Sequence, residues 1–494
     1  MFRQAAVVTR LASNRRLVQA GSRRWNSSNA SGTSTPSSKL PWAIGAVAVT
    51  GGGIYFASGS TKTTAVGSKL GQGTQVPTIQ QPTSEAEISV TSPVKVVSLK
   101  EANERLREQA NTFVFDSKDG SKGRVDLVRF NSNMPVEDEW ALSVGKGIGG
   151  ATTLFAGVYD GHAGWATSAV LRQALIPYVS TSLVKLDQSS SGDLVDTAIK
   201  NAFVRLDDRI TANAKEAAAS STEQGSADVI SAIAPAIAGS CALLTMYDVK
   251  SSTLRTAVTG DSRAVLGSWS PETGNFSADP VSKDQTGFNQ DEVDKLDKAH
   301  PGEKDVILDP KSGRLMGFAI TRAFGDHRLK WTADSIKELQ SNFFGFGTLK
   351  QESKTPPYMI ATPEVTTRQV KSEDFVILGS DGLWDCISSD DAVACVSRWL
   401  AAKRAGKPEA VTEASTTLKV GDHGWPEWKA TPEYFAIEDL DSAAICLVKN
   451  AFGGNRRGLF CGVMSLASPM SRYVRDDITV QVIFFKDPYT AERK

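Results

Sequence analysis

Several segments of the chain have the apolar patterns of strands. Residues 476–485 alternate between apolar and polar side chains at their start, so Ile478 and its alternate neighbours would share one strand face. Residues 153–160 and 374–381 are apolar runs that stop at an aspartate, and each predicts a further strand. Residues 240–269 predict three more strands joined by short turns.

Two long segments have apolar residues at helical spacing, residues 165–183 and 193–210. In the first, Trp165 and Leu175 fall on roughly one face, and in the second Leu194 begins the apolar face. Strand runs separated by long helices predict an α+β fold, with antiparallel sheets covered by helices. The sequence contains no internal repeat.

The N-terminal part differs from the rest, because its first acidic residue is Glu85. Residues 1–30 are rich in arginine and serine, which is typical of a mitochondrial transit peptide, and the alternative is a basic tail without function. Residues 40–58 are uncharged and apolar, which fits a membrane anchor or sorting segment as well as a flexible apolar linker. Residues 59–100 have the composition of a disordered linker, so the folded domain is expected at 101–490.

The overall composition narrows the range of functions only slightly. With 55 basic and 55 acidic residues the formal net charge is zero, which gives no reason to expect a nucleic-acid partner. The five cysteines include no Cys-x-x-Cys pair, so we expect buried thiols and neither a disulfide framework nor a zinc site.

Four aspartates lie at the ends of predicted strands. Asp160, Asp261 and Asp381 each follow a strand, whereas Asp476 precedes the last one. If the last strand runs antiparallel to its neighbours, all four carboxylates reach one edge of the sheets. Carboxylates crowded in this way repel each other unless a cation lies between them.

Neighbouring residues add the groups that a phosphate hydrolase needs. Glu137 and Asp138 lie in a loop after a strand and could join the carboxylates. An all-oxygen ligand set suits Mg²⁺ or Mn²⁺, and two such ions can activate a water for attack on phosphorus. Gly161 allows a sharp turn that could present its carbonyl oxygen to a metal, and His162 could protonate the leaving group.

Taken in order, these motifs resemble the metal-dependent protein serine/threonine phosphatases of the 2C family, from about residue 110 to 487. The resemblance is strongest to the branch of mitochondrial pyruvate dehydrogenase phosphatases. It implies a β-sandwich of two antiparallel sheets flanked by α-helices, with a binuclear Mg²⁺ or Mn²⁺ site at one edge. The motifs are VEDEW, VYDGHAG, TGDSRAVL, TRAFGD, GSDGLWD and RDDITV.

The resemblance also implies roles for individual residues. Asp160 would bridge two metal ions, Asp381 and Asp476 would bind one each, Gly161 would offer its carbonyl oxygen, and His162 would be the general acid.

Other residues would have supporting roles by the same resemblance. Glu137 and Asp138 would act directly or through waters, and Asp261 and Asp385 match positions where the family can hold a weaker third metal. Asn133 stands where many members have an arginine that holds the substrate phosphate. An amide cannot supply a bidentate cationic fork, so phosphate affinity is in question, although the pyruvate dehydrogenase phosphatase branch resembles this chain in having asparagine.

The leading hypothesis is a mitochondrial phosphatase that hydrolyses phosphoserine and phosphothreonine with metal-activated water. It would lie in the matrix, or at the inner membrane and in the intermembrane space. Its expected substrate is the E1 component of pyruvate dehydrogenase, which dephosphorylation would activate. One alternative is the same chemistry on another mitochondrial phosphoprotein. Another is an inactive binding scaffold, which the retained Asp160, Asp381 and Asp476 argue against.

Overall fold

The computed structural model describes residues 94–118, 120–220, 223, 226–342, 346–347, 353–420 and 426–489. The predicted transit peptide at 1–30 and the apolar segment at 40–58 lie outside these residues, as does most of the predicted linker. Within the described part of the chain, no helix is both long and apolar enough to span a bilayer.

A six-stranded antiparallel sheet contains the first and the last strand of the described chain. Its strand order is β1-β2-β18-β15-β9-β10. The last strand, β18, lies between β2 and β15 and is antiparallel to both, which is the condition for the predicted convergence of the aspartates. The strands are β1 (Ala110–Asp116), β2 (Lys122–Phe130), β9 (Arg263–Ser270), β10 (Asn275–Pro280), β15 (Phe375–Gly379) and β18 (Ile478–Phe484).

A five-stranded antiparallel sheet packs against the first one. Its order is β14-β8-β7-β4-β3. The strands are β3 (Glu139–Lys146), β4 (Thr152–Tyr159), β7 (Ala242–Asp248), β8 (Thr253–Thr259) and β14 (Glu364–Gln369). Alternate residues of β4 face different cores, because Leu154 and Val158 pack between the two sheets whereas Phe155 packs against helices.

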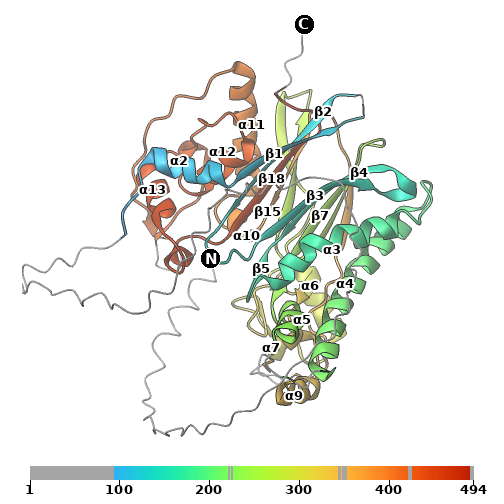
Figure 1. Ribbon diagram of the computed structural model, residues 1–494. Coiled ribbons are helices and arrows are strands. Elements are labelled where there is room, and N and C mark those ends of the chain that lie inside the picture. The colour runs from blue at the N-terminus through green and yellow to red at the C-terminus, as the bar shows by residue number, and fades with distance from the viewer. Residues whose placement is uncertain are drawn as a thin grey trace, which may run out of the picture. The chain divides into compact units, whose positions relative to one another are not determined.

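Helices cover the outer face of each sheet, as Figure 1 shows. The five-stranded sheet is covered by α3 (Ala166–Leu183), α4 (Gly192–Ser220) and α5 (Ala227–Ile237). The six-stranded sheet is covered by α2 (Leu99–Glu108), α11 (Ser389–Ala405), α12 (Ala443–Ala451) and α13 (Arg457–Ser465). The predicted α+β sandwich with flanking helices is therefore confirmed.

Shorter elements connect these layers. A small three-stranded sheet is formed by β5 (Gly161–His162), β6 (Gly239–Ser240) and β13 (Phe324–Gly325), and a hairpin by β11 (Leu308–Asp309) and β12 (Arg314–Leu315). A second hairpin pairs β16 (Lys419–Val420) with β17 (Pro426–Glu427). The short helices are η2 (Ile148–Gly150), α6 (Gln290–Ala299), α7 (Lys304–Ile307), α8 (His327–Lys330), α9 (Ala333–Asn342), α10 (Asp381–Trp384), η3 (Pro432–Tyr434) and η4 (Met470–Tyr473).

Two details of the predicted helix faces are wrong. Trp165 is 51% exposed and Leu194 is 56% exposed, so neither belongs to a buried face. Both lie at or beside a helix start, where the chain has not yet turned toward the core; Trp165 is the residue before α3. All five cysteines are free thiols, and the prediction that they are buried holds for four of them, whereas Cys386 is partly exposed.

Candidate active site

The pairing within the five-stranded sheet brings Asp160 and Asp261 together. The end of β4 lies beside the start of β7, with Val158 opposite Leu243, and the start of β7 lies beside the end of β8. Asp160 follows β4 and Asp261 follows β8, and both are at least nine-tenths buried. One ligand atom from each lies within 4.8 Å of the other and of the sulfur of Cys241.

The sulfur of Cys241 is a member of this group that the sequence did not predict. Its Sγ lies 3.3 Å from Oδ1 of Asp261, to which the thiol donates. Burial and the negative charges of Asp261 and Asp160 raise the pKa of the thiol well above its usual value. A thiol whose pKa is raised in this way is a poor metal ligand, so the carboxylate oxygens are the atoms of the group that suit a metal ion.

Asp381 and Asp476 reach the same region from the six-stranded sheet. Gly379, at the end of β15, lies opposite Val480, near the start of β18. The aspartates that follow β15 and precede β18 therefore lie at the same end of the two strands, as predicted. The backbones are in close contact here, because a Cβ added to Gly382 would lie 2.1 Å from the carbonyl oxygen of Asp477.

Asp477 fixes the loop that contains Glu137 and Asp138. Its carboxylate accepts hydrogen bonds from the backbone nitrogens of Ser132 (2.5 Å), Asn133 (2.8 Å) and Glu137 (2.8 Å). The adjacent aspartate, Asp476, instead accepts from Arg472. The two neighbouring aspartates thus have different surroundings, and only Asp476 lines a cavity with Gly161 and His162.

Burial and neighbouring carboxylates raise the pKa of Glu137 and of Asp138. Burial raises the pKa of Glu137 and, more strongly, that of Asp138, and the negative charges of Asp477 and Asp476 raise both further. Asp138 also accepts a 2.8 Å hydrogen bond from Ser380, just before Asp381. Divalent cations would relieve this repulsion, and the oxygen donors fit Mg²⁺ or Mn²⁺.

His162 is held by a residue to which the sequence assigned no role. Its Nε2 lies 2.6 Å from Oδ2 of Asp326, which is almost completely buried. Asp326 ends the TRAFGD motif and has a left-handed backbone with φ of 52°. A Cβ on Gly239 would lie 2.1 Å from Nε2 and 2.3 Å from Oδ2, so this glycine makes room for the pair.

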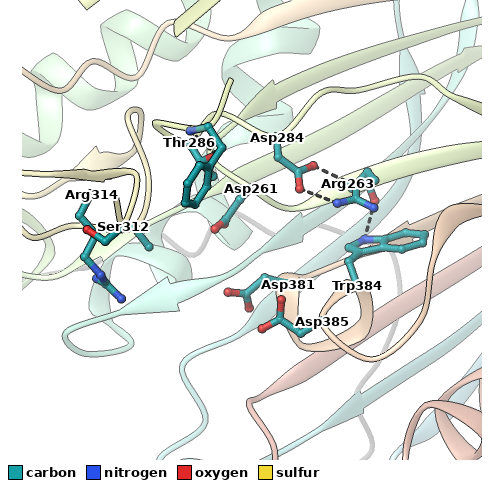
Figure 2. A pocket seen from close by; sticks show the side chains of 11 residues that line it. Asp261, Arg263, Asp284, Thr286, Ser312, Arg314, Asp381, Trp384 and Asp385 are labelled. Carbon is teal, nitrogen blue, oxygen red and sulfur yellow. Dashed lines mark hydrogen bonds and ion pairs between the residues drawn. The ribbon is translucent and has the colours of Figure 1, made fainter. Parts of the chain in front are cut away.

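Two adjoining cavities are lined by most of the predicted residues, although Asn133, Asp138 and Asp160 line neither of them. The first, of about 240 Å³, is lined by Asp261, Asp381 and Asp385 among others, and Figure 2 shows these carboxylates around one open space. The second, of about 220 Å³, is lined by Glu137, Gly161, His162 and Asp476 among others.

Asn133 lies beside the acidic residues without contributing positive charge. Its Nδ2 lies 3.1 Å from both Oε2 of Glu137 and Oδ2 of Asp477, so the amide is hydrogen-bonded to carboxylates. Arg322 does not line either cavity. Its Nε and Nη2 donate hydrogen bonds of 2.7 Å to the two carboxylate oxygens of the buried Glu292.

Comparison with known proteins identifies the family. A family model described as protein phosphatase 2C matches residues 145–419, more than half of the chain. The chain belongs to the protein phosphatase 2C family. It is therefore a protein serine/threonine phosphatase of a metal-dependent family. Glu137, Asp138 and Asp476 lie outside the range that the family model matches.

Individual 2C-family relatives match over most of their length. The chain is 38% identical to a protein phosphatase 2C homologue of Schizosaccharomyces pombe, over 78% of this chain and 84% of that protein. It is 32% identical to mitochondrial pyruvate dehydrogenase phosphatase 1 of Saccharomyces cerevisiae, over 85% and 77%. The human protein of that name is 28% identical, over 80% and 83%.

Proposed function

We propose that this phosphatase hydrolyses phosphoserine and phosphothreonine at the two adjoining cavities, using Mg²⁺ or Mn²⁺. The observation that supports this site is the convergence of carboxylates from both sheets beside His162. Asp160 and Asp261 come from the five-stranded sheet, and Asp381 and Asp476 from the six-stranded sheet.

The carboxylates would hold the ions. Asp160, Asp381 and Asp476 would hold them with their carboxylates, and Gly161 would add its carbonyl oxygen. Bound ions supply Lewis acidity, which activates the attacking water and offsets charge on the phosphate. Glu137 and Asp138 lie in a loop beside these carboxylates and would act on the ions directly or through bound waters.

A weaker third ion fits the first cavity. Asp261 and Asp385 both line it together with Asp381. The position of Asp385 at the end of α10, where its backbone nitrogen donates to the carbonyl of Asp381, keeps the two residues in adjacent turns.

His162 would protonate the serine or threonine oxygen as it leaves. Nε2 faces Asp326, so we assign the proton transfer to Nδ1. The buried carboxylate of Asp326 orients the ring and stabilises its protonated form, as an acid requires. Asp326 is thus a positioning residue.

We further propose a mitochondrial enzyme whose substrate is the phosphorylated E1 component of pyruvate dehydrogenase. The Saccharomyces cerevisiae and human relatives support this target by their names, and the arginine-rich, acid-free N-terminus supports the organelle. The Schizosaccharomyces pombe relative has a name without a target. The second candidate is therefore the same reaction on another mitochondrial phosphoprotein.

The reaction is tested by phosphate release from a phosphoserine peptide of pyruvate dehydrogenase E1. The full chain is assayed with Mg²⁺, with Mn²⁺ and with EDTA, and Asp381→Asn is the control. Metal-dependent release that the variant lacks is expected. If the chain bound Mn²⁺ yet released no phosphate from any phosphopeptide, the catalytic proposal would be wrong and an inactive scaffold would remain.

The target needs a separate test in cells. Deletion of the gene should raise phosphorylation of E1 above that of other mitochondrial proteins in comparative phosphoproteomics. A rise confined to a different mitochondrial phosphoprotein would leave the chemistry intact and replace the target.

A further inference from the structure

Asp326 can orient His162 only if its own position is fixed, and it lies in a left-handed turn. Gly325 and Asp326 both have positive φ, of 72° and 52°. Glycine adopts this conformation readily, whereas an aspartate there has to be held by its surroundings. The placement also has to be close, because a shift of about 1 Å in a reacting geometry can lower a rate roughly 100-fold.

Backbone pairing holds one side of this turn. Gly325 is the last residue of β13 and lies opposite Gly239 of β6. The backbone nitrogen of Asp326 donates a 3.0 Å hydrogen bond to the carbonyl oxygen of Ala238. A Cβ added to Gly325 would lie 2.2 Å from that same oxygen, so the two segments are in close contact here.

An ion pair holds the other side of the turn. Asp207 lies in α4, and its Oδ2 is 2.5 Å from Nζ of Lys330, the last residue of α8. Oδ1 of Asp207 accepts a 2.9 Å hydrogen bond from the backbone nitrogen of Gly325, and Nζ of Lys330 donates a 2.8 Å hydrogen bond to the carbonyl oxygen of Ala323. The pair therefore binds the backbone just before Asp326 and the helix that follows it.

Packing of α4 brings the carboxylate of Asp207 to this turn. Phe203 lies one helical turn before Asp207, and its ring contacts that of Phe324, with centroids 5.6 Å apart. Both phenylalanines are fully buried. The helix and the strand β13 are thus packed together next to the hydrogen bond that Gly325 donates.

Stability alone is a weak reason for an ion pair at this position. The side chains of Asp207 and Lys330 are 11% and 7% exposed, so both charges have lost most of their water. A pair of apolar side chains of similar volume is often at least as stable in such surroundings. What apolar side chains could not do is accept from the backbone of Gly325 and donate to that of Ala323.

We infer that Asp207 and Lys330 are positioning residues for the general acid, which hold the turn so that Asp326 reaches His162. The inference rests on the proposed phosphatase function and adds to it the means by which the acid is kept in place. Neither residue of the pair lines either cavity, so neither would touch the substrate.

The test compares kcat on a phosphoserine peptide with kcat on an aryl phosphate, using the Mn²⁺-saturated full chain. Asp207→Ala and Lys330→Met should each lower kcat on phosphoserine on the order of 10-fold and lower kcat on the aryl phosphate much less, because an aryl oxide leaves without protonation. Asp207→Asn keeps the shape of the side chain and an oxygen that can accept from Gly325. It should therefore retain more of the rate on phosphoserine than Asp207→Ala does.

Lys449→Met is the control for a merely structural effect. Lys449 is 2% exposed and pairs with Glu438 at 2.7 Å, in the helical layer over the six-stranded sheet. Its replacement should lower the free energy of unfolding and leave the ratio of the two rates unchanged. The inference is overturned if Asp207→Ala keeps the ratio of the unmodified chain, or if Lys449→Met changes that ratio as much.

A double variant tests whether the pair acts through Asp326. In a chain that already carries Asp326→Asn, the further change Asp207→Ala should reduce kcat on phosphoserine little more, because both changes weaken the same contact. Fully additive losses would show that Asp207 acts by another route and would overturn the inference.

Hydrogen exchange of the full chain gives a readout that is independent of turnover. Peptides from residues 323–331 should exchange faster in Asp207→Ala than in the unmodified chain, because the N–H group of Gly325 loses its acceptor. Unchanged exchange in this segment would overturn the inference even in an active enzyme. If the chain released no phosphate from any phosphopeptide, the proposed function would fail, whereas faster exchange would still show that Asp207 holds the turn.

Discussion

Replacement of Asp326 by asparagine removes the charge opposite His162 while keeping the size of the side chain. The backbone should tolerate the change, because asparagine readily adopts the left-handed conformation found at this position, with φ of 52°. The 2.6 Å contact is a buried hydrogen bond to a charged group, a class that contributes about 1.5–3 kcal/mol. Loss of that stabilisation should slow proton donation by His162 roughly 10- to 100-fold.

The assay compares kcat on a phosphoserine peptide with kcat on an aryl phosphate, using the same Mn²⁺-saturated protein. Asp326→Asn should lower the first far more than the second, because an aryl oxide leaves without protonation. Asp334→Asn is the control, since Asp334 is almost fully exposed on α9 and should leave both rates unchanged. Equal losses on both substrates would refute the assignment of His162 as an acid oriented by Asp326.

Three further perturbations test other parts of the structure. Gly239→Ala should cause a similar selective loss on phosphoserine, since its methyl group would lie 2.1 Å from Nε2 of His162; an unchanged ratio of the two rates would contradict this. Saturating Mn²⁺ should raise Tm, with about 2.7 kcal/mol of added stability at 100 times Kd, and Asp381→Asn should abolish the shift in a thermal melt. Arg322→Met should lower the free energy of unfolding by about 3 kcal/mol in urea, because it leaves the buried carboxylate of Glu292 without its fork; a loss below 1 kcal/mol would show that the pair is dispensable.

Strong local patterns predicted most of the sandwich correctly. The strands now seen as β4, β15 and β18 and the helices α3 and α4 all lie where their apolar patterns placed them. The helix α12 was not predicted, and all nine of its residues are buried, including the polar Lys449 and Asn450.

The convergence of Asp160 with Asp261, and of Asp381 with Asp476, followed from strand direction and was predictable for that reason. The roles of Asp326 and Cys241 were not. Asp326 reaches His162 across 164 positions of sequence, through a left-handed turn that no local pattern reveals. The Gly-Asp pair at the end of the TRAFGD motif was the one local feature that could have indicated a role for Asp326. Such a pair is also common in ordinary turns, so it did not identify the residue.

The distribution of the acidic residues over both sheets has a consequence for folding kinetics. Asp160 and Asp381 follow strands of different sheets, so a chain that has formed only one sheet lacks half of the ligands. Ions that need both sheets would bind late, after the transition state for docking. Added Mn²⁺ should then lower the unfolding rate while leaving the refolding rate nearly unchanged. The cation would therefore stabilise the assembled sandwich kinetically.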